Sequence, residues 1–289
     1  MKKSQGRIAL GLISPAFILF LVFNAYPLLW SLYISFTKWD GFNPVKKFIG
    51  FDNYKYLFTN SEFLTSIRVT TIYVVIVTIL STILGFAIAI ALQNIKNAYF
   101  YRTLFFSPVV TATVAAGVVW QLIFDPFSGI VNKFLAIIHI VGPNWLSDPK
   151  YSLPAVIVVG IWKRIGFAMV VFAAGLAALP ISTYEAAALD GAQGWKAIRY
   201  ITIPLLKPII LVVLITGFID AIQVFDHIFV MTGGGPMGST QVLSLLLYNQ
   251  GFKLFNLGVA SAIGWIILAF VLGITLTQRF LFKNRDLNA

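Results

Sequence analysis

Four charged side chains interrupt apolar runs of the sequence and are the first candidates for chemistry. Lys163 and Arg164 fall in one run, and Asp220 and Asp226 fall in or near the end of the next. A charge inside a membrane is costly, so it usually faces a cavity or an opposite charge. Lys163 lies about sixteen residues before the end of its run, and Asp220 lies about sixteen residues after the start of the next run. At 1.5 Å per residue, both are roughly 24 Å along the helix from the loop that joins the two runs. The two side chains would lie at similar depth in the membrane, so an ion pair between them is geometrically possible.

These charges have two interpretations. They line a polar substrate cavity between spans, or they fix helix packing through ion pairs, with the basic side chains able to extend to the outer surface. Trp162 favours the binding cavity, because it would add an aromatic platform beside hydrogen-bonding groups. Gln223, Thr111 and Thr113 would add hydrogen bonds. Alternatively, Trp162 belongs to the aromatic belt of a membrane protein.

Other kinds of site are not indicated by the residue types. The sequence has no G-x-x-x-x-G-K-[ST] motif and no Gly-Lys pair, and Gly233–Pro236 is typical of a tight turn rather than a phosphate loop. His139 and His227 are far apart, no cysteine occurs, and no metal-ligand spacing is present. We expect no catalytic site, no metal site and no cofactor, and read both histidines as interfacial or structural.

Composition and hydropathy patterning indicate an all-α polytopic membrane protein. Apolar residues make up 59% and charged residues 11% of the 289 residues, and the apolar residues come in long runs. The net charge of +11 comes mostly from basic residues that flank these runs. We expect one domain over residues 1–289, with an uncleaved first span and six transmembrane helices. They are predicted at 12–36, 69–92, 104–124, 153–179, 205–230 and 258–280.

Several local signals refine this prediction. Pro27 is expected to kink the first span, and Pro108, Pro154 and Pro204 are placed near helix starts. Residues 134–141 are apolar but too short to span, which favours an interfacial helix. The distribution of lysine and arginine favours an orientation with both termini inside.

The predicted inner loop 182–204 has the pattern of a helix–turn–helix elbow. Ser182 and Glu185 form a capping box, so a helix is expected to start there. Gly191 can adopt the left-handed conformation that ends a helix. A second short helix is predicted at 195–200, before Pro204 opens the fifth span. Such an elbow could serve as a connector or as a helix-in-groove contact with a partner protein.

The loop resembles the EAA motif of ABC-importer permeases. The matching segments are EAAALDGA and ITIPLLKP, and the motif positions are Glu185, Ala186, Ala187, Gly191, Ile203 and Pro204. SPAFILFLVFNAYPLLWSLYISF and IGFDNY are similar to the opening of carbohydrate-uptake permeases. FDHIFVMTGGGP is similar to the same region of maltose-type F and glycerol-phosphate-type A subunits. The resemblance covers nearly the whole chain.

This resemblance implies a type I ABC-importer permease fold in the cell (inner) membrane, with cytoplasmic termini. Residues Glu185 to Gly191, including Asp190, would be a coupling helix that contacts an ATPase subunit. The implied partners are a second homologous permease, an ABC ATPase dimer that binds the ATP, and an extracytoplasmic substrate-binding protein. In that family an aromatic residue at the position of Trp162 is similar to a sugar-facing one.

The residues are compatible with two substrate classes and with two functions. The family is less often cationic at Lys163 and Arg164, so an anionic substrate such as a uronide or sugar phosphate would be accommodated as well as a neutral sugar. The alternative function is a stand-alone secondary transporter or channel, in which the intramembrane charges form an ion relay and the loop at Glu185 is a connector.

Overall fold

The computed structural model describes residues 12–283, and it is helical almost throughout. Five helices are long and apolar enough to cross a membrane, and a sixth span results if one bent pair of helices is counted together. The all-α membrane fold class is confirmed. The described residues divide into two compact units, 12–64 with 246–268 and 65–245 with 269–283, which are described separately.

The first unit contains the first span and a small polar cap. The span runs over Leu12–Ser35 and includes a π-helical turn at Leu21–Ala25 before α2 (Tyr26–Ser35). A hairpin follows, in which β1 (Thr37–Lys38) pairs antiparallel with β2 (Lys47–Phe48), and then α3 (Asp52–Thr59).

Buried Asn53 holds this cap together. Its Nδ2 atom donates to the carbonyls of Ser35 and Thr37 at 2.8 and 2.9 Å. The unit is completed by a π-helical turn at Asn249–Lys253 and by the first part of α15 (Leu257–Lys283).

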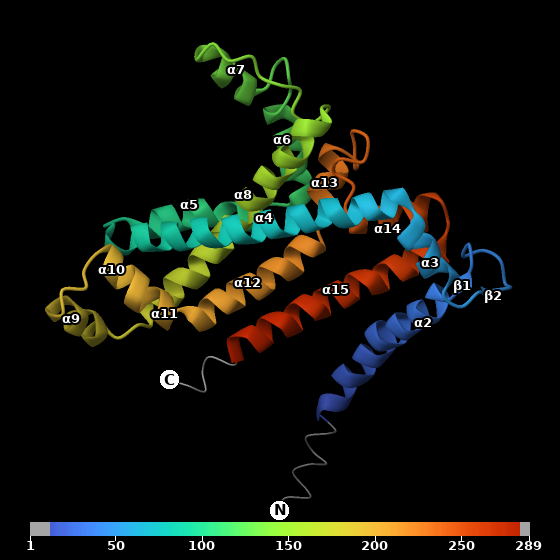
Figure 1. The fold of residues 1–289 in the computed structure, drawn as a ribbon, viewed down its shortest axis with the longest axis horizontal. Helices are drawn as coiled ribbons and strands as arrows, with labels where there is room; N and C mark the ends of the chain where they lie inside the picture. The colour runs from blue at the N-terminus through green and yellow to red at the C-terminus, as the bar shows by residue number, and fades with distance from the viewer. Residues whose placement is uncertain (1–11, 284–289) are drawn as a thin grey trace, which may run out of the picture. The chain divides into compact units, whose positions relative to one another are not determined.

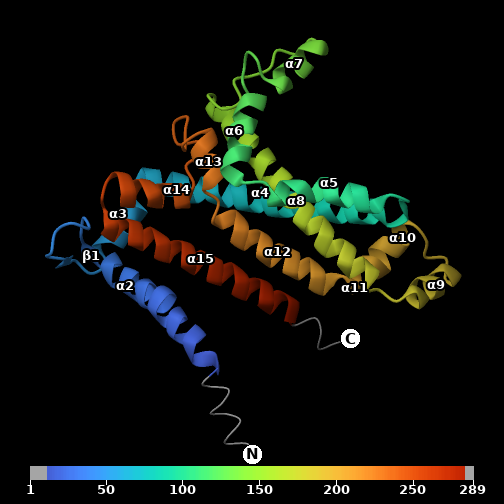
Figure 2. The same cartoon turned by 180° about the vertical axis from the view of Figure 1, so that it is seen from behind.

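The second unit carries the remaining spans. It contains α4 (Ser61–Ala91, whose first turn belongs to the first unit), α5 (Ala98–Val110) and α8 (Pro149–Ala177), which lie side by side in both views (Figures 1 and 2). A 3-10 turn at Leu92–Asn94 follows α4. The other elements of this unit are α6 (Thr113–Ile123), α7 (Ile130–Ile137), α9 (Ile181–Leu189), α10 (Trp195–Ala197), α11 (Ile203–Leu205), α12 (Lys207–Ile222), α13 (Asp226–Met231) and the first half of α14 (Leu243–Tyr248).

Close helix packing in this unit depends on small residues. Gly85 of α4 lies against α8 so tightly that a Cβ atom on it would be 2.6 Å from the Cβ of Ala168. Gly166 of α8 lies against the backbone of Phe105 in α5. Small residues commonly allow helices to approach closely in a membrane. The hydrophobic effect does not drive helices together there, because lipid tails are as apolar as the side chains. Around these contacts Met169, Phe172 and neighbouring apolar side chains form the buried core.

The third span differs from the prediction. Residues 104–124 were expected to form one helix, but α5 and α6 meet at 101° around Thr111 and Ala112. Pro108 lies near the end of α5, so the prediction that it opens a helix is wrong. Proline lacks an N–H and weakens the helical hydrogen bonding around it, which favours a break here. The break exposes backbone carbonyls that another group must satisfy.

Smaller details of the prediction also changed. The helix α4 begins at Ser61 rather than near residue 69, and Pro154 lies inside α8. The short helix α7 spans Ile130–Ile137 instead of 134–141, and its interfacial position stays a prediction. The predicted turn at Gly233–Pro236 is confirmed, with Gly233 and Gly234 at φ of 59° and 93°.

The tight contact at Gly85 generates a stability prediction. The substitution Gly85→Leu should cost about 1–3 kcal/mol, because the new side chain collides with α8 backbone and side-chain atoms. Thermal unfolding of the purified protein, followed by size-exclusion chromatography, measures the loss. The control is Gly273→Leu, at a helical position where a Cβ atom would meet nothing within 4 Å. An equal melting temperature for the two variants would contradict this account of the packing.

Candidate functional site

The helix α8 presents two consecutive basic residues to different neighbours. Lys163 donates from Nζ to the carbonyl oxygen of Pro108 at 2.9 Å and to that of Thr111. These are the carbonyls exposed where α5 breaks from α6. Lys163 therefore caps the broken end of α5, and a cation at a helix C-terminus also complements the helix dipole.

Arg164 points toward α12, since successive residues of a helix lie about 100° apart. Its side chain is 8% exposed, and it forms an ion pair with Asp220 through Nη1. Its Nη2 atom donates to the carbonyl of Val213 at 3.0 Å and to the hydroxyl of Thr216 at 3.1 Å. Gly217 makes room for the guanidinium, because a Cβ atom there would be 3.0 Å from Nη2.

The ion pair between Lys163 and Asp220 that the sequence allowed does not form, and the partner of Asp220 is Arg164. Lys163 and Arg164 are adjacent, so the membrane depth inferred from their positions in the sequence is nearly the same and cannot show which of them pairs with Asp220. What decides the pairing is the direction of each side chain around α8. Lys163 faces the break between α5 and α6, which the sequence did not reveal, and only Arg164 reaches α12.

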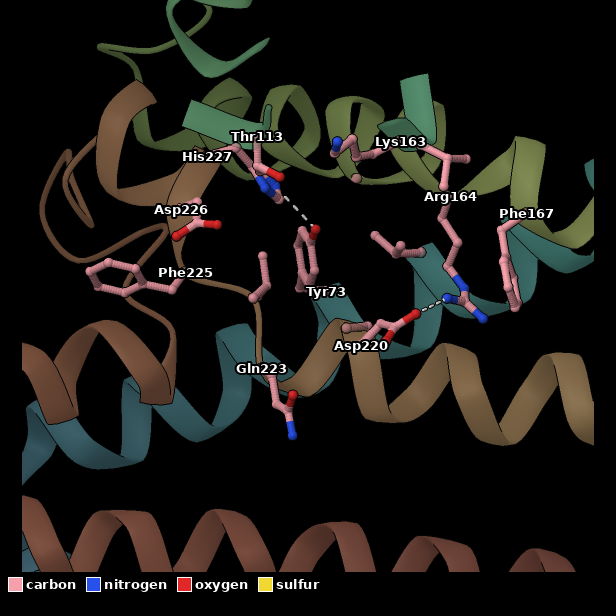
Figure 3. Close-up of a pocket in the computed structure, with 15 residues that line it drawn as sticks. Tyr73, Thr113, Lys163, Arg164, Phe167, Asp220, Gln223, Phe225, Asp226 and His227 are labelled. Atoms are coloured by element: carbon pink, nitrogen blue, oxygen red, sulfur yellow. Dashed lines mark hydrogen bonds and ion pairs between the residues drawn. The ribbon is translucent and has the colours of Figure 1, made fainter. Parts of the chain in front are cut away.

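A cavity of about 340 Å³ lies beside these residues (Figure 3). Its wall comes from α4, α5, α6, α8, α12 and the segment that enters α13. The volume is at the lower end of the range for small-molecule sites. The lining includes Tyr73, Val77, Val109, Thr113, Gly160, Lys163, Arg164, Phe167, Asp220, Ala221, Gln223, Val224, Phe225, Asp226 and His227.

One wall of the cavity is a fixed polar pair. The hydroxyl of Tyr73 in α4 lies 3.1 Å from Nε2 of His227 in α13, and both side chains are buried. Gly160 of α8 leaves the space that the Tyr73 hydroxyl occupies. This geometry supports the structural interpretation of His227, which joins two helices rather than standing free in the cavity.

The structure brings most of the predicted binding residues together. Thr113, Lys163, Arg164, Asp220 and Gln223 line the cavity. Thr111 contributes its carbonyl to Lys163, while its hydroxyl donates to the backbone of its own helix.

Trp162 is not among the lining residues. Its ring packs edge-on against Trp120 of α6, with centroids 5.5 Å apart.

An aromatic residue that sequence reasoning did not select occupies the cavity wall instead. Phe225 lines the cavity and stacks on Phe229, with ring centroids 5.1 Å apart and planes 17° from parallel. It lies in the break between α12 and α13, beside Asp226. The signal that could have identified it is this aromatic–acidic pair at the end of an apolar run, which is unusual in a lipid-facing segment.

The loop after α8 forms a second candidate site. The helix α9 begins at Ile181 after Pro180, and no side chain caps its first turn, so the predicted Ser182–Glu185 capping box is wrong. Gly191 has φ of 75°, as predicted, and Ala192 N–H donates to the carbonyl of Ala187 at 2.8 Å. The predicted second helix is present as α10 followed by a π-helical turn at Ile198–Thr202.

The surface of this loop is apolar and exposed. Glu185, Ala186 and Asp190 are exposed, while Ala187 is buried. Leu189 and Trp195 are 91% and 73% exposed. The loop is nevertheless fixed in shape, because the hydroxyl of Tyr184 in α9 lies 2.9 Å from that of Thr202, just before Ile203 and Pro204 in α11. A rigid element with large exposed apolar side chains is typical of a protein-binding surface.

Comparisons with known proteins agree with these features. The family model described as "Binding-protein-dependent transport system inner membrane component" matches residues 57–285. The chain is 35% identical to the trehalose/maltose transport system permease protein MalF of Thermococcus litoralis, over 99% of this chain and 96% of that protein. It is 34% identical to the sn-glycerol-3-phosphate transport system permease protein UgpA of Rhizobium meliloti, over 94% of each.

The fold is also that of a solved transporter. A chain of a bacterial ABC transporter involved in the import of the acidic polysaccharide alginate superposes with a TM-score of 0.85, at 24% identity and over 97% of this chain and 96% of that one. The predicted resemblance to importer permeases is confirmed. The chain belongs to the family of inner membrane components of binding-protein-dependent transport systems.

Proposed function

We propose that this chain is the permease subunit of an ATP-driven importer for a sugar or oligosaccharide. The observation that carries the proposal is the continuous connection between the cavity and the exposed loop. The helix α8, which holds Lys163 and Arg164, leads directly into α9, and α11 leads into α12, which holds Asp220. A force on the loop would therefore act on two walls of the cavity at once.

The loop is the proposed contact for an ATPase subunit. Its segment from Glu185 to Gly191, with the exposed Leu189, would seat in a groove of the partner, a common mode of helix recognition. The bond between Tyr184 and Thr202 joins the two arms of the elbow. The elbow would then move as one body and transmit motion to α8 and α12.

The energy source lies outside this chain in our proposal. The sequence has no phosphate-binding loop of the G-x-x-x-x-G-K-[ST] type, so two partner ATPase subunits would bind and hydrolyse the ATP. A second homologous permease would complete the translocation path, and a substrate-binding protein would deliver the ligand from outside. The loop and both termini would then lie on the cytoplasmic side of the cell membrane, in line with the charge distribution.

The substrate class is inferred from the relatives and from the cavity. The relatives named above transport trehalose or maltose and sn-glycerol-3-phosphate, according to their names. The cavity combines Phe225 and Phe167 with several polar groups, which suits a ligand with an apolar face and many hydroxyls. A sugar fits this lining better than an inorganic ion would.

The coupling role of the loop generates a prediction on transport. Gly191→Val should lower substrate uptake about tenfold or more, because valine resists the left-handed backbone and distorts a contact surface. Glu185→Ala should also lower it. Uptake and ATPase activity are measured with the assembled complex in proteoliposomes.

A matched control is available for the glycine. Gly238 has φ of 74° and, like Gly191, would meet nothing within 4 Å with a Cβ atom, but it lies in the turn after α13. Gly238→Val should retain most of the uptake. Normal uptake by both the Gly191 and the Glu185 variants, with no ATPase co-purifying with the chain, would contradict the proposal.

The ion pair between α8 and α12 generates a second prediction. Asp220→Asn should lower stability by about 2 kcal/mol, because it leaves the buried Arg164 without its counter-charge. This is less than the cost for a fully buried pair, since Asp220 is 66% exposed.

The double variant Arg164→Met with Asp220→Asn should recover most of the melting temperature but not the uptake. A double variant no more stable than Asp220→Asn alone would show that the uncompensated charge of Arg164 is not the cause of the loss.

A further inference from the structure

The two basic side chains of the cavity, Lys163 and Arg164, are bound to other groups of the chain. Lys163 donates two of its three N–H groups to the exposed carbonyls at the end of α5. The guanidinium of Arg164 is almost fully buried, and both of its Nη atoms are bound to groups of α12. Neither side chain is therefore presented to a ligand as a free cation.

Asp226, in contrast to these two basic residues, presents its side chain to the cavity. It lines the cavity with an exposed side chain, and within residues 12–283 no hydrogen bond or ion pair joins its carboxylate to another group. Figure 3 shows Asp226 between His227 and Phe225, at the end of the cavity away from Arg164. Asp220 pairs through Oδ2, so its other oxygen remains available. The carboxylate oxygens of Asp226 and the second oxygen of Asp220 are thus available to accept hydrogen bonds from a ligand.

The charges of the lining cancel. Lys163 and Arg164 offset Asp220 and Asp226, so the ionised side chains of the wall sum to zero. A ligand carboxylate or phosphate would meet the carboxylate of Asp226, and the charge of Lys163 already acts on that carboxylate. Like-charge juxtaposition disfavours the binding of such a ligand. A cationic ligand would meet the ammonium group of Lys163.

A neutral sugar avoids both penalties. Its hydroxyls can donate to the oxygens of Asp226, and such charge-assisted hydrogen bonds are stronger than neutral ones. Its C–H face can lie on Phe225, whose ring is held by stacking on Phe229.

We propose that the cavity accepts an uncharged, hydroxyl-rich sugar unit and disfavours uronates and sugar phosphates, and that Asp226 is the residue that sets this preference. The proposal rests on the function proposed above and narrows its substrate class. It also answers the question that Lys163 and Arg164 raised in the sequence. Their donors are largely used by the carbonyls of α5 and by α12, and their charges are offset by Asp226 and Asp220.

Equilibrium binding to the assembled complex in nanodiscs tests the proposal. The probes are maltotriose and mannotriose as neutral ligands, trigalacturonate as the acidic ligand of equal length, and the glucosamine trimer as the cationic one. A neutral trisaccharide should bind most tightly, and trigalacturonate at least about tenfold more weakly.

Variants of Asp226 assign the preference to this residue. Asp226→Asn should weaken binding of the neutral ligand about tenfold. Asp226→Lys should shift the ratio of acidic to neutral binding toward trigalacturonate by at least about tenfold. The control Asp52→Asn makes the same chemical change at an exposed surface pair outside the cavity, and it should leave all affinities unchanged.

Three results would overturn the proposal: tightest binding of trigalacturonate or of the glucosamine trimer to the unaltered chain, an unchanged ligand preference in Asp226→Lys, or binding of none of the probes. The first decides the matter even if the variants fail to fold. A complex that couples ATP hydrolysis to uptake of acidic sugars would refute the charge preference and leave the importer function standing. A chain that assembles with no ATPase would refute the importer function itself.

Discussion

A buried guanidinium in an apolar helix bundle needs a counter-charge and hydrogen-bond acceptors, and much of the second unit is arranged around this need. Arg164 obtains both from α12, where Asp220, Val213 and Thr216 face it and Gly217 leaves it room. The adjacent Lys163 satisfies the carbonyls released where α5 breaks from α6. Two consecutive residues of α8 thereby hold two neighbouring elements, the end of α5 and α12, and form part of the wall of the cavity.

The same helices reach the exposed loop that we propose as the coupling site. The helix α8 ends at Ala177, four residues before α9 begins, and α11 is followed closely by α12. The elbow between them is held in shape by Tyr184 and Thr202 while its apolar side chains remain uncovered. A partner that displaced the elbow would pull on helices that are joined to each other by the Arg164 ion pair. This gives the ion pair a mechanical role between the loop and the cavity.

Features set by composition and local pattern were predictable from the sequence. Long apolar runs have few folds available in a bilayer, so the helical class followed directly. Gly191 and the glycines at 233 and 234 adopt positive φ as their positions between helices suggested. The EAA resemblance identified the family that the comparisons support.

Features set by side-chain direction were not predictable. The apolar stretch at 104–124 gave no sign of the helix break at Thr111. Without the break, the bond from Lys163 to the carbonyls at the end of α5 could not be predicted. The pairing of Asp220 depended on rotation around α8, which spacing along the run does not give. Trp162 has the right chemistry for a sugar platform, but it packs against Trp120, and the cavity uses Phe225 instead.

In the transporter as we propose it, Lys163 and Arg164 stabilise the fold, and the acidic and aromatic groups of the cavity contact the ligand. A cryo-electron microscopy structure of the assembled transporter with a sugar trapped in the cavity tests this most directly. We predict that Arg164 remains on Asp220, that Lys163 remains on the carbonyls of α5, and that sugar hydroxyls lie within hydrogen-bond distance of Asp226. A ligand bound to Lys163 or Arg164, with the bond to the α5 carbonyls or to Asp220 broken, would contradict this prediction.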